Sequence, residues 1–321
     1  MADEQNERRT QQGDAKGAPL GLDKVIDHFE NHRNRVADRM EAGDLRGQKI
    51  RSRSEKLLTR ILSGVVYVVI VVSCIVAGQW STAGLVSAMA WLCCSEYFRM
   101  ARLSGRMPNE ILGLAFALLF PLAARLNGLP LMLIAVFLLL IMCGGWYVVT
   151  PRASIADVAI TFFGPIYTSL SFSALVLIRM QGTRVEGAIF TLLVMLSVWA
   201  NDTLAYFVGS RFGKHKLAPR ISPNKTLEGF WGGIAGSVAV WLCMAIFHVS
   251  GVTYPIALVA GPLVGVASVA GDLFESRIKR GVGVKDSGNI MPGHGGLLDR
   301  SDAMLFGCMV AYLVMHVGGI L

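Results

Sequence analysis

Residues 272–302 carry most of the side chains in this sequence that could do chemistry. Five carboxylates, five Lys or Arg cations, one histidine and several glycines lie there between two long apolar runs. Carboxylates hold divalent cations, Lys and Arg neutralise phosphate oxygens, and glycines let the backbone approach an anionic ligand. The segment therefore favours phosphate and metal chemistry. A solvated loop held by ordinary ion pairs is the alternative.

The spacing of the polar residues in this segment predicts where they point. Asp272 and Ser276 are four residues apart and share one helical face, with Lys279 one turn further on. Asp299 and Asp302 are three residues apart at the start of the last apolar run. We therefore expect the two helix ends to bring Asp272 and Asp299 together around one ion.

The same segment resembles the signature of the phosphatidate cytidylyltransferase family, also called CDP-diacylglycerol synthases. The pattern fixes the gaps between cations, carboxylates and a His-Gly-Gly turn from residue 276 to residue 302. Met291 and Ser301 depart from it, and Ser301 is expected to cap a helix instead. The matched positions are Ser276, Lys279, Arg280, Lys285, Asp286, Gly288, Pro292, His294, Gly295, Gly296, Asp299, Arg300 and Asp302.

A second polar segment spans residues 201–228. Asp202 lies about two turns inside an apolar run, roughly 12 Å from the loop at 1.5 Å per residue. An ionisable residue at that depth is costly and is a functional candidate by default. We expect Asp202 and Tyr206 to line a polar cleft from one helical face. A structural ion pair between Asp202 and a cation of another helix is the alternative.

The second segment also contains a short polar turn, in which Ser222 and Thr226 supply hydroxyls and Lys225 an ammonium. These groups suit phosphate oxygens. A basic loop that only sets topology and meets anionic headgroups is the alternative. The runs 202–213 and 222–229 resemble the same cytidylyltransferase family, so the two matches together cover most of residues 200–302.

The resemblance implies an integral membrane enzyme that transfers CMP from CTP to phosphatidic acid, giving CDP-diacylglycerol and pyrophosphate. It also implies dependence on Mg²⁺, and a second cation is left open. We expect the metal at Asp272 and Asp299. Catalytic roles are expected for Asp202, Lys225, Asp286, His294 and Asp302. Contacts to substrate are expected from Ser222, Thr226, Ser276, Lys279, Arg280, Lys285 and Arg300.

Other functions stay open at this stage. A paralogue could use another lipid phosphate as acceptor. A polyprenyl-phosphate sugar-1-phosphate transferase would be polytopic and Mg²⁺-dependent too, but it would use a different acidic motif. A transporter should concentrate polar groups near the bilayer midplane, whereas here most of them lie at helix ends. A membrane scaffold without catalysis is the remaining alternative.

Composition places both segments in a membrane protein. Of the 321 residues, 53% are hydrophobic, which is high for a soluble domain. The net charge is +8. The excess of Lys and Arg is concentrated in the loops on one predicted side of the membrane. It is therefore explained by membrane topology, and no nucleic-acid partner is expected. The six cysteines lie in apolar runs without metal-ligand spacing and are expected to be buried small hydrophobes.

The hydropathy pattern predicts an all-α, polytopic integral membrane protein with about nine transmembrane helices. Most of the apolar runs reach the ~20 residues that span hydrocarbon. The third run contains Pro121 and is the least regular. The runs are 57–78, 80–100, 111–126, 129–149, 154–178, 187–209, 229–249, 252–272 and 302–321.

The first part of the chain differs from the rest. Residues 1–56 form a polar extension that is expected to be disordered up to about Pro19. Apolar residues recur at helical spacing within 22–40, which indicates an amphipathic helix, either on the membrane surface or packed weakly elsewhere. Residues 57–321 are expected to form the transmembrane cytidylyltransferase domain.

The distribution of Lys and Arg predicts orientation. With a cytoplasmic N-terminus, both polar segments face the cytoplasm, and only Arg125, Arg179 and Arg184 lie on the opposite side. The expected location is the inner cell membrane, with a cytoplasmic polar active site and an external C-terminus. CTP, phosphatidic acid and the bilayer are the expected partners, and a homodimer is left open.

Overall fold

The computed structural model describes residues 61–291 and 295–320. The predicted polar extension over 1–56, with its disordered start and amphipathic helix, lies outside these residues. His294, predicted as catalytic, also lies outside them.

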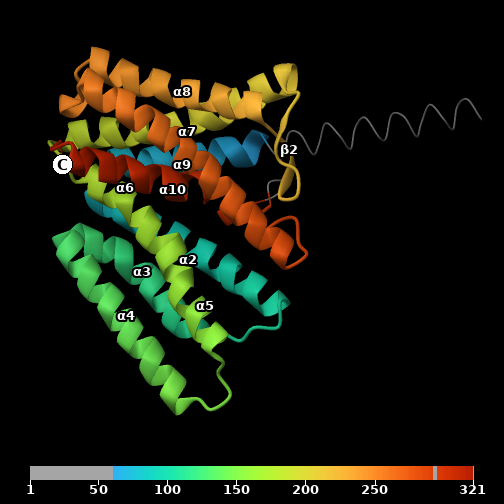
Figure 1. The fold of residues 1–321 in the computed structure, drawn as a ribbon. Coiled ribbons are helices and arrows are strands. Elements are labelled where there is room, and N and C mark those ends of the chain that lie inside the picture. The colour runs from blue at the N-terminus through green and yellow to red at the C-terminus, as the bar shows by residue number, and fades with distance from the viewer. Residues whose placement is uncertain (1–60, 292–294, 321) are drawn as a thin grey trace, which may run out of the picture. The chain divides into compact units, whose positions relative to one another are not determined.

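Helices make up almost all of the described chain, which confirms the all-α class (Figure 1). A helix over Ile61–Ala77 comes first. The following elements are α2 (Gln79–Leu103), α3 (Glu110–Asn127), α4 (Leu129–Val149), α5 (Ile155–Pro165), the π-helix η1 (Ile166–Leu170), α6 (Ser171–Arg179), α7 (Arg184–Phe212), β1 (Lys216–Ala218), β2 (Ser222–Thr226), α8 (Leu227–Ile246), the 3₁₀-helix η2 (Val249–Gly251), α9 (Tyr254–Gly281) and α10 (Leu298–Val317).

Within the described residues, six helical segments are long and apolar enough to cross a membrane. They are α3, α4, the continuous segment α5–η1–α6, α7, α8 and α9. The protein is therefore an integral membrane protein by the length and composition of its helices. The predicted runs 57–78, 80–100 and 302–321 coincide with the helix Ile61–Ala77, α2 and α10, so the count of nine spans stays a prediction.

Side-chain caps fix where several of these helices begin. Asn109 accepts a hydrogen bond from the backbone N–H of Leu112 at the start of α3. Ser154 opens α5 with a capping box to Asp157, and Thr183 opens α7 in the same way. Each cap satisfies N–H groups that have no partner inside the helix.

Two prolines affect their helices differently. Pro121 lies within α3, which continues through it, so the expected irregularity of the third run is not seen. Pro165 ends the regular part of α5, and the five-residue π-helix η1 follows before α6 resumes. A proline lacks an N–H and breaks the hydrogen-bond ladder, which explains the local change of pitch.

The helices α7, α8, α9 and α10 lie side by side (Figure 1). Small residues allow the close approach of α7 and α8, since a Cβ added at Gly236 would lie 2.8 Å from the carbonyl oxygen of Ala200. Close backbone packing of this kind stabilises helices in lipid, where the hydrophobic effect does not hold them together.

A short hairpin joins α7 to α8. Strands β1 and β2 pair antiparallel, with Lys216 opposite Thr226 and Ala218 opposite Ser222. The sequence predicted only a polar turn here. Thr226 ends β2 and caps α8, accepting from the N–H of Gly229 at 3.2 Å. The hairpin therefore lies where the C-terminal end of α7 meets the N-terminal end of α8.

Candidate active site

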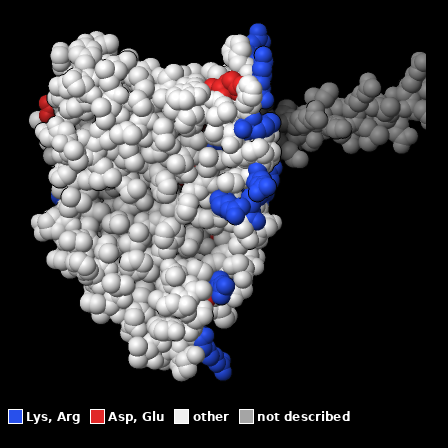
Figure 2. Space-filling view, in the orientation of Figure 1, with Lys and Arg blue, Asp and Glu red and all other residues white. Residues whose placement is uncertain are grey.

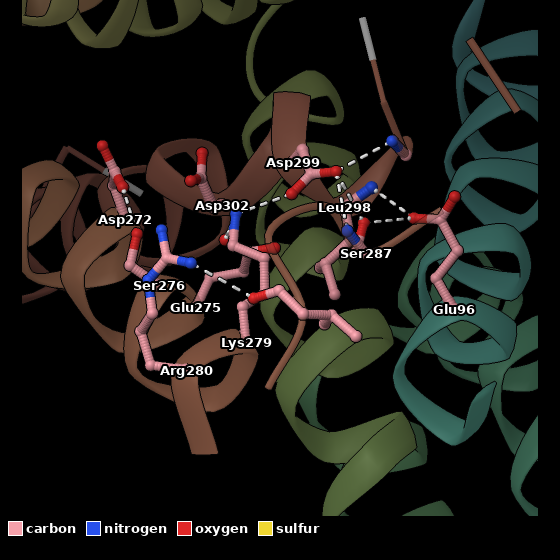
Figure 3. A network of polar contacts seen from close by, with 12 residues as sticks. Glu96, Asp272, Glu275, Ser276, Lys279, Arg280, Ser287, Leu298, Asp299 and Asp302 are labelled. Carbon is pink, nitrogen blue, oxygen red and sulfur yellow. Dashed lines mark hydrogen bonds and ion pairs between the residues drawn. The ribbon is translucent and has the colours of Figure 1, made fainter. Parts of the chain in front are cut away.

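The two polar segments meet at Asp272 on α9. Its Oδ2 forms an ion pair with the Nζ of Lys225 on β2 at 2.5 Å. Its Oδ1 accepts a hydrogen bond from the Ser276 hydroxyl one helical turn away, at 3.2 Å (Figure 3). The Lys225 and Asp272 side chains are 25% and 31% exposed, so the pair can be reached from solvent. This contact joins the two regions that the sequence analysis selected.

Two further carboxylates belong to the same region. Asp202 interacts electrostatically with Asp272, with Lys225 and with Arg300 on α10. Asp302 interacts electrostatically with Asp272 and Asp202. We call Asp202, Asp272, Asp302 and Lys225 the open cluster.

Asp202 occupies an accessible position within the open cluster. It is exposed although it lies more than two turns before the end of α7. Its electrostatic partners come from β2, α9 and α10, so it faces these elements. The polar cleft predicted beside Asp202 stays a prediction. Tyr206 is 72% exposed and contacts Phe207, and within the described residues no hydrogen bond, ion pair or ring contact ties it to the cluster.

A second polar group lies next to the open cluster. Lys279 on α9 forms ion pairs with Glu275 one turn earlier and with Asp299 on α10. The Lys279 Nζ lies 2.6 Å from Asp299 Oδ1. The other oxygen, Oδ2, accepts from the Ser287 N–H at 2.9 Å, from the Ser287 hydroxyl at 3.0 Å and from the Gly296 N–H at 2.8 Å. Asp299 is 5% exposed in this pair, and Glu275 is fully buried.

These donors determine the charge state of Asp299, which lies in the first turn of α10 and outside the six candidate spans. Burial by itself would raise the pKa of its carboxyl. The ion pair with Lys279 and the N–H donors of Gly296 and Ser287 outweigh burial and hold the pKa below its usual value. Asp299 is therefore a carboxylate whose two oxygens both accept from protein donors.

Glu96 on α2 completes this second group, and the sequence analysis did not select it. Its carboxylate accepts from the Ser287 hydroxyl and from the N–H groups of Leu297 and Leu298 (Figure 3). An acid within the apolar run 80–100 is the same signal that selected Asp202, and it could have found Glu96 as well. We call Glu96, Glu275, Lys279, Ser287 and Asp299 the closed network.

The remaining predicted residues lie at the margin of these two groups. Ser222 is half-buried on β2, and the Thr226 hydroxyl is used as a helix cap. Lys285 and Asp286 are exposed in the loop after α9. Arg280 is exposed, and its guanidinium donates to the carbonyl of Val284 at 3.3 Å.

Two residues predicted from the sequence, Arg300 and Ser301, lie on α10 and have different outcomes. Arg300 is exposed and interacts electrostatically with Asp202, as noted above. Ser301 is not the expected helix cap, because α10 already begins at Leu298 and buries Ser301 inside the helix.

The predicted metal ligands Asp272 and Asp299 belong to different groups, with separate partners. Within the described residues, no set of three or more His, Cys, Asp or Glu side chains is arranged to hold a metal. The shared metal therefore stays a prediction. Carboxylate and hydroxyl oxygens at Asp272 and Ser276, with Asp202 and Asp302 nearby, are the kind of donors that Mg²⁺ takes.

Both groups lie at one end of the helices. The C-terminal ends of α2, α7 and α9 meet the N-terminal ends of α8 and α10 there. Most of the Lys and Arg side chains visible in Figure 2 gather along the edge at which β2 lies in Figure 1. An excess of cations with several carboxylates among them is suited to binding a polyanion such as a nucleotide triphosphate.

Known proteins are similar to this chain in sequence. The model of the cytidylyltransferase family matches residues 58–318. A phosphatidate cytidylyltransferase of Bacillus subtilis is 32% identical over 261 residues, covering 80% of this chain and 96% of the relative. Phosphatidate cytidylyltransferases of Staphylococcus saprophyticus and Staphylococcus epidermidis are 44% and 43% identical over 155 residues, covering 48% of this chain and 58% of each relative. The chain therefore belongs to the cytidylyltransferase family.

Proposed function

We propose that this protein is a CTP:phosphatidate cytidylyltransferase, which transfers CMP from CTP to phosphatidic acid. The products are CDP-diacylglycerol, a precursor of phospholipids, and pyrophosphate. The observation that carries the proposal is the ion pair between Lys225 and Asp272, because it joins the two polar segments selected from the sequence in one accessible site. Membership of the cytidylyltransferase family favours this enzyme over a transporter or a scaffold.

For this reaction the protein must mainly align the lipid phosphate with CTP and neutralise the negative charge of the phosphates. A phosphate oxygen of phosphatidic acid attacks the α-phosphorus of CTP, and the bond from that phosphorus to the oxygen bridging to the β-phosphate breaks. The attacking oxygen is already anionic, so no strong general base is needed. Lys225 in the open cluster and Arg300 beside it are placed to neutralise phosphate charge. Lys279 is held between two carboxylates and orients them.

The open cluster fits a divalent cation by its donor chemistry. Three carboxylates, at Asp202, Asp272 and Asp302, interact with one another electrostatically, so a bound cation would relieve their repulsion. Mg²⁺ bound there would stabilise the charge that develops on the phosphates. The second predicted ligand, Asp299, would first have to give up part of its bonding to Lys279, Ser287 and Gly296. We therefore propose Asp272 as the principal ligand, and a second cation stays a prediction.

The setting in the membrane is part of the proposal. We propose that the edge rich in Lys and Arg faces the cytoplasm, since cytoplasmic loops carry an excess of these residues. CTP would then reach the site from the cytoplasm, and phosphatidic acid would reach it from the bilayer. A cytoplasmic N-terminus, an external C-terminus and nine spans follow from the same orientation. The homodimer stays a prediction.

Pyrophosphate release tests the proposed function directly. Purified protein in mixed micelles should release pyrophosphate from CTP and form a CDP-lipid when phosphatidic acid and Mg²⁺ are present. Diacylglycerol, which lacks the phosphate, and the nucleotides ATP, GTP and UTP are the matched controls. A panel of lipid phosphates would identify a paralogue with another acceptor. Absence of turnover with CTP and every lipid phosphate would contradict the proposal.

A further inference from the structure

Glu96 is a buried acid far from both polar segments in sequence. It lies on α2, and the residue is 3% exposed. A buried carboxylate is costly unless it is hydrogen-bonded or paired with a cation. No cation is paired with Glu96 among the ion pairs of the described residues. Its stabilisation must therefore come from hydrogen-bond donors.

Those donors all belong to the segment that leads into α10. Oε1 accepts from the N–H of Leu297 at 3.0 Å. Oε2 accepts from the N–H of Leu298 at 2.8 Å and from the hydroxyl of Ser287 at 2.9 Å. Leu297 and Leu298 open α10, which has no side-chain cap of its own. A negative charge at a helix N-terminus also interacts favourably with the helix dipole. Glu96 thus acts as a cap supplied by another helix.

Two glycines show how closely this segment is fitted to Glu96. A Cβ added at Gly288 would lie 2.2 Å from Glu96 Oε1, and one added at Gly296 would lie 2.5 Å from Oε2. Contacts below 3.0 Å are not tolerated without movement of a neighbour. Both positions belong to the family-like signature. The glycines at these positions therefore leave room for the carboxylate from α2.

Ser287 connects Glu96 to the charged residues of the site. Its hydroxyl lies 2.9 Å from Glu96 Oε2 and 3.0 Å from Asp299 Oδ2. A hydroxyl has one proton, so it can donate to only one carboxylate at a time. The Ser287 N–H donates to Asp299 at 2.9 Å whichever carboxylate the hydroxyl serves. Asp299 in turn holds Lys279.

We propose that Glu96 is a positioning residue for the cytidylyl transfer. It fixes the start of α10 and Ser287, and through them the placement of Asp299 and Lys279. The inference rests on the proposed function for its catalytic consequence. It assigns a role in the site to α2, a helix of the N-terminal half that contains neither family-like segment.

The test is Glu96→Gln, which keeps the size of the side chain. In either orientation of the amide, one of the two N–H groups at Leu297 and Leu298 faces an NH₂ donor. We expect kcat to fall about tenfold, as for one unsatisfied buried group, with the KM for CTP changed by less than about twofold. Gly288→Ala displaces the carboxylate without removing it and should lower kcat in the same way.

A double-mutant cycle separates positioning from general loss of stability. If Glu96 acts through Ser287, then Glu96→Gln combined with Ser287→Ala should be no slower than the slower single variant. Ser87→Ala is the matched control, because Ser87 is buried on the same helix and donates to Leu118, away from α10. Its kcat should stay within about twofold of the wild type. Losses that multiply in the double variant, or a wild-type kcat in Glu96→Gln, would overturn the inference.

Hydrogen exchange keeps this test distinct from a test of the proposed function. The amides of Leu297 and Leu298 should exchange faster in Glu96→Gln than in the wild type, and at the wild-type rate in Ser87→Ala. Unchanged exchange in Glu96→Gln would overturn the capping role. A wild type without CTP turnover would overturn the proposed function and the catalytic consequence of Glu96, while faster exchange would still support the capping role.

Discussion

The open cluster and the closed network contain the same kinds of side chain but satisfy them differently. In the closed network, the oxygens of Glu96 and Asp299 accept protein donors at 2.6–3.0 Å. In the open cluster, Asp202 is exposed and Asp272 has a lysine and a serine as partners. Glu96 and Asp299 therefore have little capacity left for a ligand, whereas the open cluster has unused acceptors.

This difference suggests a division between groups that hold the site together and groups that could bind substrate. Carboxylates saturated by backbone N–H groups keep loops and helix ends in place. Carboxylates that repel one another beside a single lysine favour the arrival of a cation or of a cationic side chain. We therefore propose that the closed network is the support and the open cluster the reacting side, and four experiments can break or sharpen that division.

The largest effect is expected for Asp272→Asn, which removes the charge of the proposed principal metal ligand in the open cluster. We expect turnover to fall at least ~100-fold, because water replaces a carboxylate ligand poorly. The apparent Tm should change little, since partly exposed ion pairs contribute about 0–1 kcal/mol. Rates of pyrophosphate release across a Mg²⁺ titration measure the effect. A near-normal rate, or wild-type turnover that survives chelation of divalent metals, would refute the metal site.

The second experiment compares the thermal stability of a variant in the closed network with that of a variant in the open cluster. Asp299→Asn should also lose activity, but it leaves Lys279 with one carboxylate partner in a buried setting. Breaking a buried pair in this way costs about 3–5 kcal/mol, so the variant should inactivate at a clearly lower temperature than Asp272→Asn. Half-inactivation temperatures of the purified proteins, heated in parallel, measure the contrast. Equal thermal stability of the two variants would show that the division into support and reacting side is wrong.

A smaller effect is expected at the cation of the open cluster. Lys225→Met should lower kcat/KM for CTP about tenfold, the loss of one charge-assisted contact of about 1.5 kcal/mol. Lys216→Met is the matched control, because Lys216 is exposed in the same hairpin. If both variants lose the same amount, the hairpin contributes only general positive charge, and the contact between Lys225 and Asp272 has no special role.

The last experiment tests on which side of the membrane the two groups lie. The cysteine substitutions that it uses should leave the turnover rate unchanged. A single cysteine at Asn289, in the loop before α10, should react in intact cells only with a membrane-permeant thiol reagent. A cysteine at Gln181, between α6 and α7, should react with an impermeant one. Cys243, which is exposed, and Cys74 would be replaced by serine beforehand. The reverse pattern of labelling would place the site outside the cytoplasm.

Much of the fold could be predicted from sequence because lipid leaves the backbone few choices. Apolar runs of about 20 residues become helices when no water can hydrogen-bond their peptide groups. The run over 154–178 was predicted as one helix, yet η1 interrupts it after Pro165. The hairpin over 216–226 was read as a turn, since its polar residues show no strand-like alternation.

The candidate site could be predicted in composition but not in arrangement. Fixed gaps selected Ser276 and Asp299, and helical spacing selected Asp272. In the structure Ser276 donates to Asp272, whereas Asp299 pairs with Lys279, and the roles of these residues in the site stay predictions. The gaps did not reveal that Thr226 caps α8 or that Ser301 is buried inside α10. A hydroxyl has the same identity in a cap, a core or a phosphate site, and only its neighbours distinguish these roles.

The sequence by itself determined the class of chemistry and the membrane setting, because charged residues are too costly in apolar runs to occur there by default. Only the tertiary structure decided which carboxylates are saturated and which are available. Glu96 reaches Leu297 and Leu298 across about two hundred residues of chain. No local spacing encodes that contact. It exists because α2 packs where α10 begins, and the unpaired N–H groups of a helix start require an acceptor.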